Sequence, residues 1–524
     1  MTLMLNHIEE KVRSRRTFAI ISHPDAGKTT LTEALLLYGG AIRLAGSIKG
    51  RKTKKFAASD WMEMERQRGI SITSSVLQLT CGGYQINILD TPGHKDFCED
   101  TYRTLTAADS ALMLIDMAKG VEPQTVKLFE VCRRQGIPIF TFMNKIDRHG
   151  KEPLDLLDEI EKVLGISSYP MNWPVGLGSS SYGLYNRLIP QVQLQREGQK
   201  VDLIPSNGLG LNAPEIQNGL DNSIYDQLCQ EVELLDIAGE SFDQEKINTG
   251  ELTPVFFGSA LNGFGVESFF DEFLRLAPPP SPKKSCIGPV DPVSNNFSGY
   301  IFKIQANMNP AHRDRISFLR ICSGIFKRDM TVNHVRTGKK IRLPQPQQFM
   351  AQNRNIIEEA YPGDIIGLFD PGIFQIGDTL VQDDYFEFEI LPRFSPEHFA
   401  MVTTRDAKKY KQFHKGLAQL SEEGAIQIYQ AQDTGEILLG VVGELQFEVF
   451  QYRLKNEYGA DVLLQRLPYH LARWVKEPVT SLGGMLVKDE DENSVVLFEN
   501  EFSLKWAKKK NPAVSFYTPE EFFQ

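Results

Sequence analysis

Residues 22–30 read SHPDAGKTT and nearly match the phosphate-binding pattern G-x-x-x-x-G-K-[ST]. Gly27, Lys28 and Thr29 supply the second half of the pattern, whereas Ser22 stands where the first glycine is usual. The apolar run FAII precedes the loop, and the helical pattern TLTEALLLYGG follows it. A strand, a loop and a helix in this order constrain the fold strongly, because such a loop holds phosphate only between a strand and the N-terminus of a helix.

The loop contains the groups that a nucleotide phosphate needs. We expect backbone N–H groups at the helix start to hold phosphate oxygens, Lys28 to contact the terminal phosphates, and the Thr29 hydroxyl to bind Mg²⁺. A serine at the first position fits if its φ stays negative, because it adds only a small side chain there. The predicted phosphate site in this loop comprises Ser22, His23, Pro24, Asp25, Ala26, Gly27, Lys28 and Thr29.

The first half of the chain alternates buried strand patterns with helical ones. This alternation predicts a mostly parallel α/β sheet with helices on both faces. Polar or glycine-containing residues follow four of the five strand patterns, at the end where ligands bind in such sheets. The strand patterns lie at residues 18–21, 84–90, 110–116, 138–144 and 253–259.

Breaks in the pattern predict a multidomain α/β and β protein. The proline-rich segment APPPSPKKSCIGP is the clearest boundary, and the short strands and turns before it indicate an insertion in the first domain. Evenly spaced strands after it predict a small β-barrel, and mixed helices and strands beyond predict an α+β domain. The predicted units are a P-loop domain at 1–280 with an inserted subdomain at about 165–250, a linker at 281–292, a β-barrel second domain at 293–390, and an α+β third domain at 391–524.

The bulk composition predicts a cytoplasmic protein. The net charge of −10 and the pI near 5.6 argue against a chain that coats nucleic acid without specificity. We find no membrane-spanning run, no signal-peptide pattern and only six scattered cysteines without C-x-x-C pairs, which indicates reduced thiols. Two basic runs, at 48–56 and 504–510, are ordinary solvated surface unless the protein has a polyanionic partner.

Short segments at three later strand ends predict that the base is guanine. Residues 90–93 read DTPG, where Asp90 would hold Mg²⁺ through water and the N–H of Gly93 would meet a γ-phosphate. In NKID, Asp147 would accept two hydrogen bonds from guanine, a donor pair that adenine lacks. The later segment GSA would offer backbone N–H groups to the guanine oxygen. The predicted residues are Asp90, Thr91, Pro92 and Gly93 for phosphate, and Asn144, Lys145, Asp147, Ser259 and Ala260 for guanine.

In this order the motifs resemble those of the translational GTPase superfamily. RGISIT at 68–73 and DTPGH at 90–94 are similar to its switch I and switch II segments. Within the superfamily, almost the whole chain resembles the bacterial peptide chain release factor 3 family, which are class II release factors. The segments that carry this likeness are SHPDAGKTT, SDWMEMERQRGISIT, DTYRTLTAAD, IFKIQANMNPAHRDR and QLSEEGA. Ser22 at the first loop position is typical of that family.

The resemblance implies roles for residues in both switch segments. His94 corresponds to the catalytic histidine that orients the attacking water, by holding it in line rather than by full proton abstraction. Ser71 falls where related factors have the threonine that binds Mg²⁺ in the GTP state, and Thr73 is the alternative ligand.

The resemblance also concerns the surroundings of the catalytic histidine. Ile70 would form one side of a hydrophobic gate that keeps His94 away until activation, and Pro24 replaces the aliphatic residue usual on the other side. Asp25 resembles the loop acid that related factors use near the phosphates, where it implies a monovalent cation.

The function that the resemblance implies is a ribosome-dependent GTPase of translation termination. Such a protein promotes the dissociation of class I release factors from the ribosome after peptide release. Intrinsic hydrolysis is expected to be slow, because an activator in trans contributes on the order of 10³–10⁵ in such systems, and here it would be the ribosome. The implied partners are the ribosome, class I release factors, GTP and GDP, with no membrane and a monomeric chain. Ribosomal RNA is a polyanion that suits the basic run at 49–55.

Three other interpretations stay open at this stage. An elongation factor G-like or ribosome-protection GTPase shares the motifs but carries further domains, for which a chain ending at Gln524 leaves no room. A regulator that senses guanine nucleotides or the alarmone ppGpp with little turnover would use the same cleft. A P-loop ATPase is disfavoured by Asn144, Lys145 and Asp147, which fit guanine.

Overall fold

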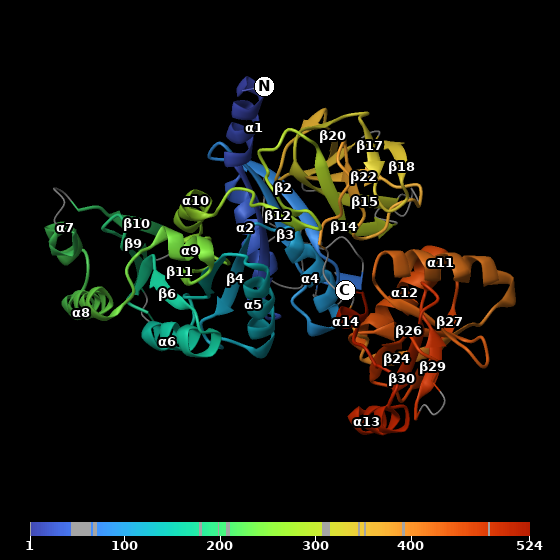
Figure 1. Cartoon of the computed structure of the whole chain (residues 1–524). Coiled ribbons are helices and arrows are strands. Elements are labelled where there is room, and N and C mark those ends of the chain that lie inside the picture. Colours follow the sequence, from blue (N-terminus) through green and yellow to red (C-terminus); the bar gives the residue numbers. More distant parts are fainter. Residues whose placement is uncertain are drawn as a thin grey trace.

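The computed structural model divides into three parts, which we call the N-terminal domain, domain II and domain III (Figure 1). In Figure 1 the inserted part of the N-terminal domain lies at the left, domain II at the upper right and domain III at the lower right. No helix among the described residues is long and apolar enough to cross a membrane. The structure describes residues 2–42, 64–65, 71–177, 181–196, 199–205, 210–306, 315–343, 346–350, 353–389, 394–479 and 483–523.

The N-terminal domain is built on a seven-stranded sheet in the order β2-β3-β1-β4-β5-β11-β6. Strand β2 is antiparallel to β3, and the other neighbours pair in parallel. Strands β1, β4, β5 and β11 are buried along their whole length, as expected where helices cover both faces. The strands are β1 (Arg15–Ser22), β2 (Ser75–Cys81), β3 (Tyr84–Asp90), β4 (Ser110–Asp116), β5 (Ile139–Asn144), β6 (Ser167–Pro170) and β11 (Leu252–Gly258).

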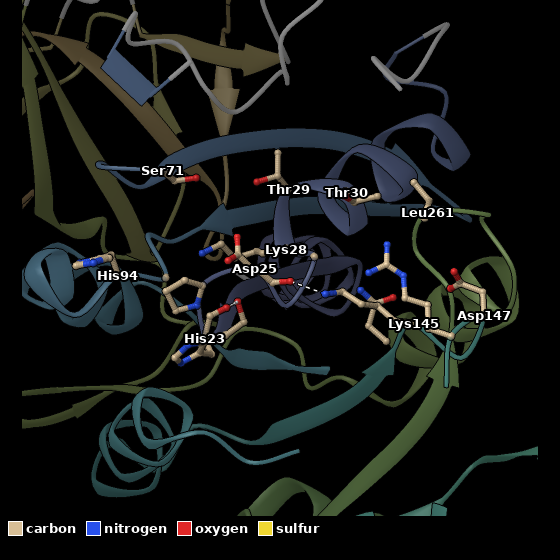
Figure 2. A pocket seen from close by; sticks show the side chains of 16 residues that line it. His23, Asp25, Lys28, Thr29, Thr30, Ser71, His94, Lys145, Asp147 and Leu261 are labelled. Atoms are coloured by element: carbon tan, nitrogen blue, oxygen red, sulfur yellow. Dashed lines mark hydrogen bonds between the residues drawn. The ribbon is translucent and has the colours of Figure 1, made fainter. Parts of the chain in front are cut away.

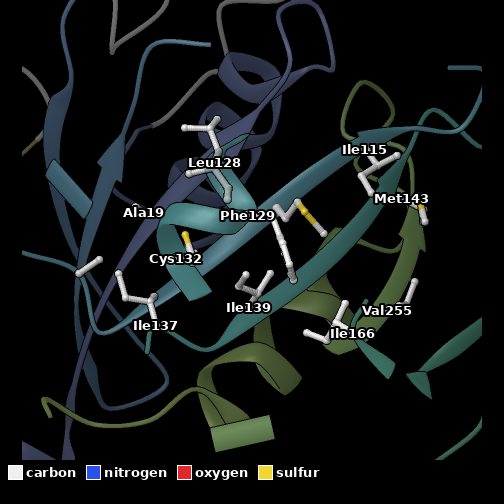
Figure 3. Close-up of a cluster of buried hydrophobic side chains, with 14 of the residues drawn as sticks. Ala19, Ile115, Leu128, Phe129, Cys132, Ile137, Ile139, Met143, Ile166 and Val255 are labelled. Atoms are coloured by element: carbon white, nitrogen blue, oxygen red, sulfur yellow. The ribbon is translucent and has the colours of Figure 1, made fainter. Parts of the chain in front are cut away.

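Alternate residues of the central strands face opposite sides of the sheet and pack against different helices. Ala19 lies in one buried cluster with Leu128 of α5 (Figure 3). Its neighbour Phe18 lies in the other cluster, where its ring is 4.6 Å from that of Phe273 in α10. The helical segments are α1 (Thr2–Arg13), α2 (Lys28–Tyr38), η1 (Lys95–Phe97), α4 (Cys98–Thr106), α5 (Pro123–Gln135), α6 (Pro153–Leu164), α9 (Gln244–Thr249) and α10 (Val266–Leu276).

The inserted part contains its own four-stranded sheet, in the order β10-β9-β8-β7. The buried Trp173 joins this sheet to α8, because its indole N–H donates to Glu231 Oε2 at 2.6 Å. Within the range 165–250 predicted as an insertion, β6 instead pairs with β11 and forms an edge of the main sheet. The inserted elements are β7 (Asn172–Val175), β8 (Ser181–Asn186), β9 (Gln191–Arg196), β10 (Gln199–Leu203), η2 (Gly210–Asn212), α7 (Pro214–Gln217) and α8 (Asn222–Ala238).

Domain II is a β domain with one eight-stranded sheet in the order β18-β17-β23-β14-β15-β22-β19-β20. A further pair, β16 and β21, lies beside it, and β12 and β13 form a hairpin within the range 281–292 that was predicted as a linker. The strands are β12 (Lys283–Ser285), β13 (Gly288–Val290), β14 (Ser298–Ala306), β15 (Arg315–Ser323), β16 (Phe326–Lys327), β17 (Thr331–His334), β18 (Lys339–Arg342), β19 (Gln347–Met350), β20 (Asn353–Ile356), β21 (Glu359–Ala360), β22 (Ile365–Phe369) and β23 (Thr379–Val381).

Domain III is an antiparallel sheet in the order β27-β24-β26-β25-β29-β30-β28, with helices α11 and α12 packed on it. Helix α13 lies at the far end of the domain from the N-terminal domain (Figure 1). The elements are β24 (His398–Thr404), η3 (Ala407–Lys409), α11 (Tyr410–Glu422), β25 (Gln427–Ala431), β26 (Ile437–Val441), α12 (Leu445–Tyr458), β27 (Val462–Leu467), β28 (Leu471–Val475), β29 (Met485–Lys488), β30 (Ser494–Phe498), α13 (Glu501–Lys510) and α14 (Pro519–Phe523).

A buried cluster of charges joins domain II to the N-terminal domain. Asp109 forms an ion pair with Arg320 of β15, and Lys283 Nζ lies 3.5 Å from the Asp109 carboxylate. Burial alone would raise the pKa of Asp109, but the positive charges of Arg320 and Lys283 outweigh it and lower that pKa. Nearby, the hydroxyl of Tyr300 donates to the carbonyl of Thr106 at 2.7 Å. These contacts make the two domains one firmly docked body.

Replacing Arg320 with alanine should lower the free energy of unfolding by about 3–5 kcal/mol, because the Asp109 carboxylate stays buried with less compensating charge. Chemical denaturation of the purified chain measures the loss. Arg342→Ala is the matched control, since the ion pair of Arg342 with Asp329 is exposed and should contribute less than about 1 kcal/mol. Equal losses in the two variants would contradict the role given to Arg320.

Candidate nucleotide-binding site

A cleft of about 410 Å³ lies at the carboxyl ends of the central strands of the N-terminal domain (Figure 2). Its walls come from the loop after β1, the start of α2, the turn after β3, and the loops after β5 and β11. Open α/β sheets bind ligands at this edge. The lining residues are Ser22, His23, Pro24, Asp25, Gly27, Lys28, Thr29, Thr30, Ser71, Gly93, His94, Asn144, Lys145, Asp147, Arg148 and Leu261.

The loop after β1 turns sharply into α2. Asp25 and Gly27 have left-handed backbone conformations, with φ of 66° and 101°. A Cβ atom at Gly27 would also lie only 2.3 Å from Nδ2 of Asn144, so this position requires glycine for two reasons. The turn brings the loop around the N-terminus of α2, where backbone N–H groups without helical partners attract anions.

Ser22, which replaces the usual first glycine, fits without strain. Its φ is not positive, and its hydroxyl donates to the carbonyl of His23 at 2.9 Å. The hydroxyl of Ser22 therefore forms its hydrogen bond within the loop and does not compete with Lys28 for a ligand in the cleft.

Gly93 of the turn after β3 packs directly against the phosphate loop. A Cβ atom at Gly93 would lie 3.3 Å from the backbone nitrogen of Pro24 and 3.4 Å from Nζ of Lys28. The Lys28 ammonium group and the backbone of Gly93 therefore border the same small volume. A lysine charge beside a glycine backbone suits the terminal phosphate of a nucleotide, which is negatively charged and needs close approach.

Three oxygen-bearing side chains suit Mg²⁺, which prefers hard oxygen ligands. Figure 2 shows the hydroxyl groups of Thr29 and Ser71 directed toward the same space. Asp90 ends β3, is buried and does not line the cleft. Within the described ranges there is no cluster of three or more His, Cys, Asp or Glu side chains for a metal.

Thr73, the alternative metal ligand, lies elsewhere. Its backbone N–H donates to Oε1 of Glu65 at 3.2 Å, and it lines a second, smaller cavity beside Lys303 of domain II. Of the two hydroxyls considered from the sequence, the Ser71 hydroxyl is the one at the nucleotide cleft.

The turn DTPG is fixed by hydrogen bonds to its own surroundings. The hydroxyl of Thr91 donates to the carbonyl of Ile20 at 2.7 Å, and the hydroxyl of Thr101 donates to the carbonyl of Pro92 at 3.1 Å. Thr91 and Pro92 do not line the cleft, so they shape the turn that carries Gly93 rather than present side chains to a ligand.

At the other end of the cleft, Asp147 has the properties of a ligand-binding carboxylate. Its Oδ1 atom is buried and has no hydrogen-bond partner among the described residues. Figure 2 places Asp147 beside Leu261, whose side chain is 45% exposed. A buried acceptor without a donor costs free energy, which a ligand with two adjacent N–H groups would remove.

Asn144 does not point its amide at the space for a base. Its Nδ2 donates to the carbonyl of Ala26 at 2.8 Å, and its Oδ1 accepts from the N–H of Ala260 at 2.9 Å. The side chain therefore ties the phosphate loop to the loop after β11. Ser259 and Ala260 are buried and do not line the cleft; Leu261, which directly follows them, does.

Lys145 makes a second tie to the phosphate loop. Its Nζ donates to the carbonyl of Asp25 and to Oδ2 of Asp116, both at 2.7 Å. Asp116 ends β4 and is not among the residues predicted from the sequence for this site. In the sequence, the position of Asp116 at the end of a predicted strand could have indicated a role at this edge of the sheet.

His94 lies at the end of the cleft opposite Asp147, with its ring turned away from Lys28 (Figure 2). Its Nδ1 accepts from the backbone N–H of Asp96 at 3.3 Å, and Oδ1 of Asp96 lies 3.3 Å from the same nitrogen. Oδ2 of Asp96 accepts from the N–H of Leu445, the first residue of α12 in domain III, at 2.8 Å. Asp96 was missed by sequence reasoning, and it connects the predicted catalytic histidine to domain III.

Two sequence predictions fall outside the described residues. These are Ile70, predicted as one side of a hydrophobic gate, and the basic run at 49–55. Both stay predictions. Pro24, predicted on the other side of the gate, lines the cleft, and so does Asp25.

Comparison with protein families accounts for each of the three domains. Residues 13–279 match the family described as "Elongation factor Tu GTP binding domain". Residues 296–383 match "Elongation factor G domain 2", and residues 388–508 match "Class II release factor RF3, C-terminal domain".

Full-length relatives give a more specific result. A protein of Symbiobacterium thermophilum named "Peptide chain release factor 3" is 57% identical over 523 residues, which cover 98% of this chain and 99% of that protein. Proteins of the same name from Ligilactobacillus salivarius and Listeria monocytogenes are 55% and 54% identical, over 97–98% of this chain and 98–99% of theirs. A crystal structure of a Thermus thermophilus protein has a TM-score of 0.70 at 22% identity, covering 91% of this chain and 72% of that one, and shows a shared fold.

The position of Asp147 predicts a test of base selectivity. Asp147→Asn should weaken binding of GTP and GDP by about 100-fold or more, because two hydrogen bonds to a charged acceptor are lost. It should raise the affinity for xanthine nucleotides, since the amide can donate to the oxygen that replaces the guanine amine. Titration with fluorescent nucleotides measures both. Unchanged GTP affinity in the variant would remove Asp147 from the base site.

Proposed function

The chain belongs to the peptide chain release factor 3 family, and on that premise we propose that it removes class I release factors from the ribosome. As a member it is a GTPase of translation termination, and GTPases of its kind depend on Mg²⁺ and bind ribosomes. The observation that carries the proposal is the single cleft lined by Lys28, Ser71, His94 and Asp147. These residues come from the phosphate loop, from both switch segments and from the predicted base site.

We assign the cleft to GTP, with its phosphates at Lys28 and its base at Asp147. The loop of residues 22–29 and Gly93 would hold the β- and γ-phosphates, while Leu261 would cover one face of the base. Mg²⁺, when bound, would neutralise charge that develops on the phosphates during transfer. Thr29 and Ser71 offer it their hydroxyls, and Asp90 would act on it through water. A monovalent cation near Asp25 is the further ion that we propose.

His94 would position the attacking water. In-line attack on the γ-phosphate needs a water held in place more than it needs a strong base. In the structure the His94 ring is turned away from Lys28, and its Nδ1 is engaged by Asp96. Hydrolysis therefore requires the ring to turn toward the cleft. This requirement supports slow intrinsic turnover and activation by the ribosome.

Domain III is placed to influence both switch segments. Asp96 of η1 accepts from the start of α12, and Val449 of α12 packs in one buried cluster with Ile72 and Phe97. Ile72 follows Ser71 of switch I, and Asp96 and Phe97 lie in η1, directly after the switch II segment 90–94. We propose that a shift of α12 on the ribosome moves Asp96 and lets His94 enter the cleft.

The remaining assignments concern partners and location. We propose that the protein acts in the cytoplasm as a monomer, with class I release factors as its protein partners. The alarmone ppGpp would compete with GTP and GDP for the same cleft, since it offers the same base and phosphates to Lys28 and Asp147. Sequence identity to proteins named release factor 3 favours this function over an elongation factor G-like or ribosome-protection activity.

GTP turnover with and without ribosomes tests the central proposal. Ribosomes should stimulate the wild-type chain on the order of 10³-fold or more, and His94→Ala should lose most of that stimulation. Binding of fluorescent GDP and GTP should be unchanged in the variant, because Asp147 and Lys28 hold the nucleotide. Release of a labelled class I release factor from terminated ribosomes should require the wild-type chain and GTP. A chain that binds GTP but neither hydrolyses it on ribosomes nor releases the factor would favour a nucleotide sensor.

Gly443→Ala tests the link from domain III. A Cβ atom at Gly443 would lie 2.3 Å from Cβ of Asp96, so the substitution must displace either Asp96 or the start of α12. Because Asp96 then holds His94 away from the cleft less firmly, kcat without ribosomes should rise by about three-fold or more, with GDP affinity within two-fold of wild type. Lys455→Ala, exposed on the same helix, is the control and should keep full activity. Wild-type kcat for Gly443→Ala would separate α12 from catalysis.

A further inference from the structure

Helix α13 of domain III presents an outer face that its packing does not explain. Leu504 and Ala507 are buried in a small core with Val496 and Phe498 of β30, which fixes the inner side of the helix. Residues three and four apart share one face of a helix. On the side opposite the core, this spacing aligns five exposed residues in one continuous row. They are Phe502, Lys505, Trp506, Lys509 and Lys510.

Two aromatic side chains on this face are exposed, Phe502 largely and Trp506 in part, because the Trp506 ring packs against Gly483. Phe502 is 78% exposed and Trp506 is 39% exposed. Lys510 Nζ lies 5.8 Å from the Trp506 ring centre, within reach of a cation–π interaction. Large aromatic side chains grouped on a surface indicate a binding site more often than single exposed apolar residues do.

Among the described residues, the positive charges on this face, those of Lys505, Lys509 and Lys510, have no ion-pair partner. Two acidic groups at α13 are directed to other cations: Glu501, four residues before Lys505, is 3.9 Å from Arg473, and Glu521 interacts with Lys508. Cations in the last turn also favour the helix dipole, but the dipole does not explain Lys505 or the two aromatic rings.

The location of α13 leaves this face accessible. Figure 1 shows α13 at the outer end of domain III, away from the N-terminal domain and domain II. Helix α12, by contrast, contacts the N-terminal domain through Leu445. A partner on α13 could therefore stay bound while α12 moves. The start of α13 is fixed by a capping box between Asn500 and Ser503, so the face is held in a defined orientation.

We propose that Phe502, Lys505, Trp506, Lys509 and Lys510 form an RNA-docking face. Lysines can neutralise backbone phosphates, and exposed aromatic rings can stack on unpaired bases; RNA presents both groups together. The net charge of −10 repels RNA from the protein as a whole, so binding has to be local. The proposal rests on the proposed function, because a ribosome is the RNA-bearing partner. An acidic protein surface could form ion pairs with the lysines, but it would have no bases to stack on the two aromatic rings.

Trp506 provides the first test, by fluorescence. Of the four tryptophans, Trp173 and Trp474 are buried and Trp61 lies outside the described residues, so the measurement uses a chain with Trp61→Phe, in which contact with RNA bases should quench Trp506 preferentially. A single-stranded RNA 12-mer should quench the emission of this chain, and adding Trp506→Phe should abolish the quenching. Quenching that persists in the double variant, or no quenching in the Trp61→Phe chain, would overturn the proposal.

Ribosome binding provides the second test. A triple variant should bind ribosomes more weakly than the wild type; it combines Lys505→Gln, Lys509→Gln and Lys510→Gln. The slope of its plot of log Kd against log salt concentration should be smaller by about two, because three phosphate contacts are lost. Trp506→Ala should weaken binding at least about five-fold at constant salt. Lys508→Gln, on the flank, is the matched control and should leave the slope unchanged. Circular dichroism and GDP affinity check that each variant is folded.

The outcomes separate this inference from the proposed function. A triple variant with wild-type affinity and slope would overturn the docking face, even if ribosomes stimulate GTP hydrolysis normally. A reduced slope without any effect of Trp506→Ala or RNA quenching would assign the face to an acidic protein partner and overturn the RNA assignment. If ribosomes fail to stimulate hydrolysis while the RNA 12-mer still quenches Trp506, the docking face stands and the proposed function fails.

Discussion

The buried amide of Asn144 connects the loops at the carboxyl end of the parallel sheet. The amide uses its donor on the carbonyl of Ala26 and its acceptor on the N–H of Ala260, so it joins the phosphate loop to the loop after β11. It lies so close to Gly27 that no Cβ atom fits there. Lys145 adds a tie from the same strand end to Asp25. These bonds join loops from distant parts of the sequence and so fix the walls of the cleft.

The two interfaces of the N-terminal domain differ in kind. The interface with domain II contains the buried pair of Asp109 and Arg320, and separating buried charges from their partners is costly. The interface with domain III is made of a few polar contacts, such as Arg103 to the carbonyl of Gly424, and a small apolar cluster. The first interface is suited to act as a fixed frame. The second is suited to change its arrangement, and it touches both switch segments.

Much of the fold followed from local patterns in the sequence. The strand ends, the glycine of the phosphate loop and the proline-rich boundary are encoded by neighbouring residues, and the matching families agree with the predicted fold class. What escaped prediction depends on contacts between distant residues. Asp96 meets Leu445 only in the folded chain, Asp116 acts through Lys145, and the amide of Asn144 bonds to the backbone of two distant loops. No local pattern distinguishes such residues from ordinary polar ones.

The contact between Asp96 and Leu445 has a consequence for the order of events during synthesis. Every residue that lines the cleft precedes α10, whereas α12 is made only after the whole of domain II. Domains fold as units and the N-terminal one folds first as the chain emerges. A nascent chain can therefore complete its nucleotide cleft while the partner that anchors Asp96, and through it the ring of His94, has not yet been translated. Guanine nucleotide can be taken up co-translationally, before the restraint on the histidine is in place.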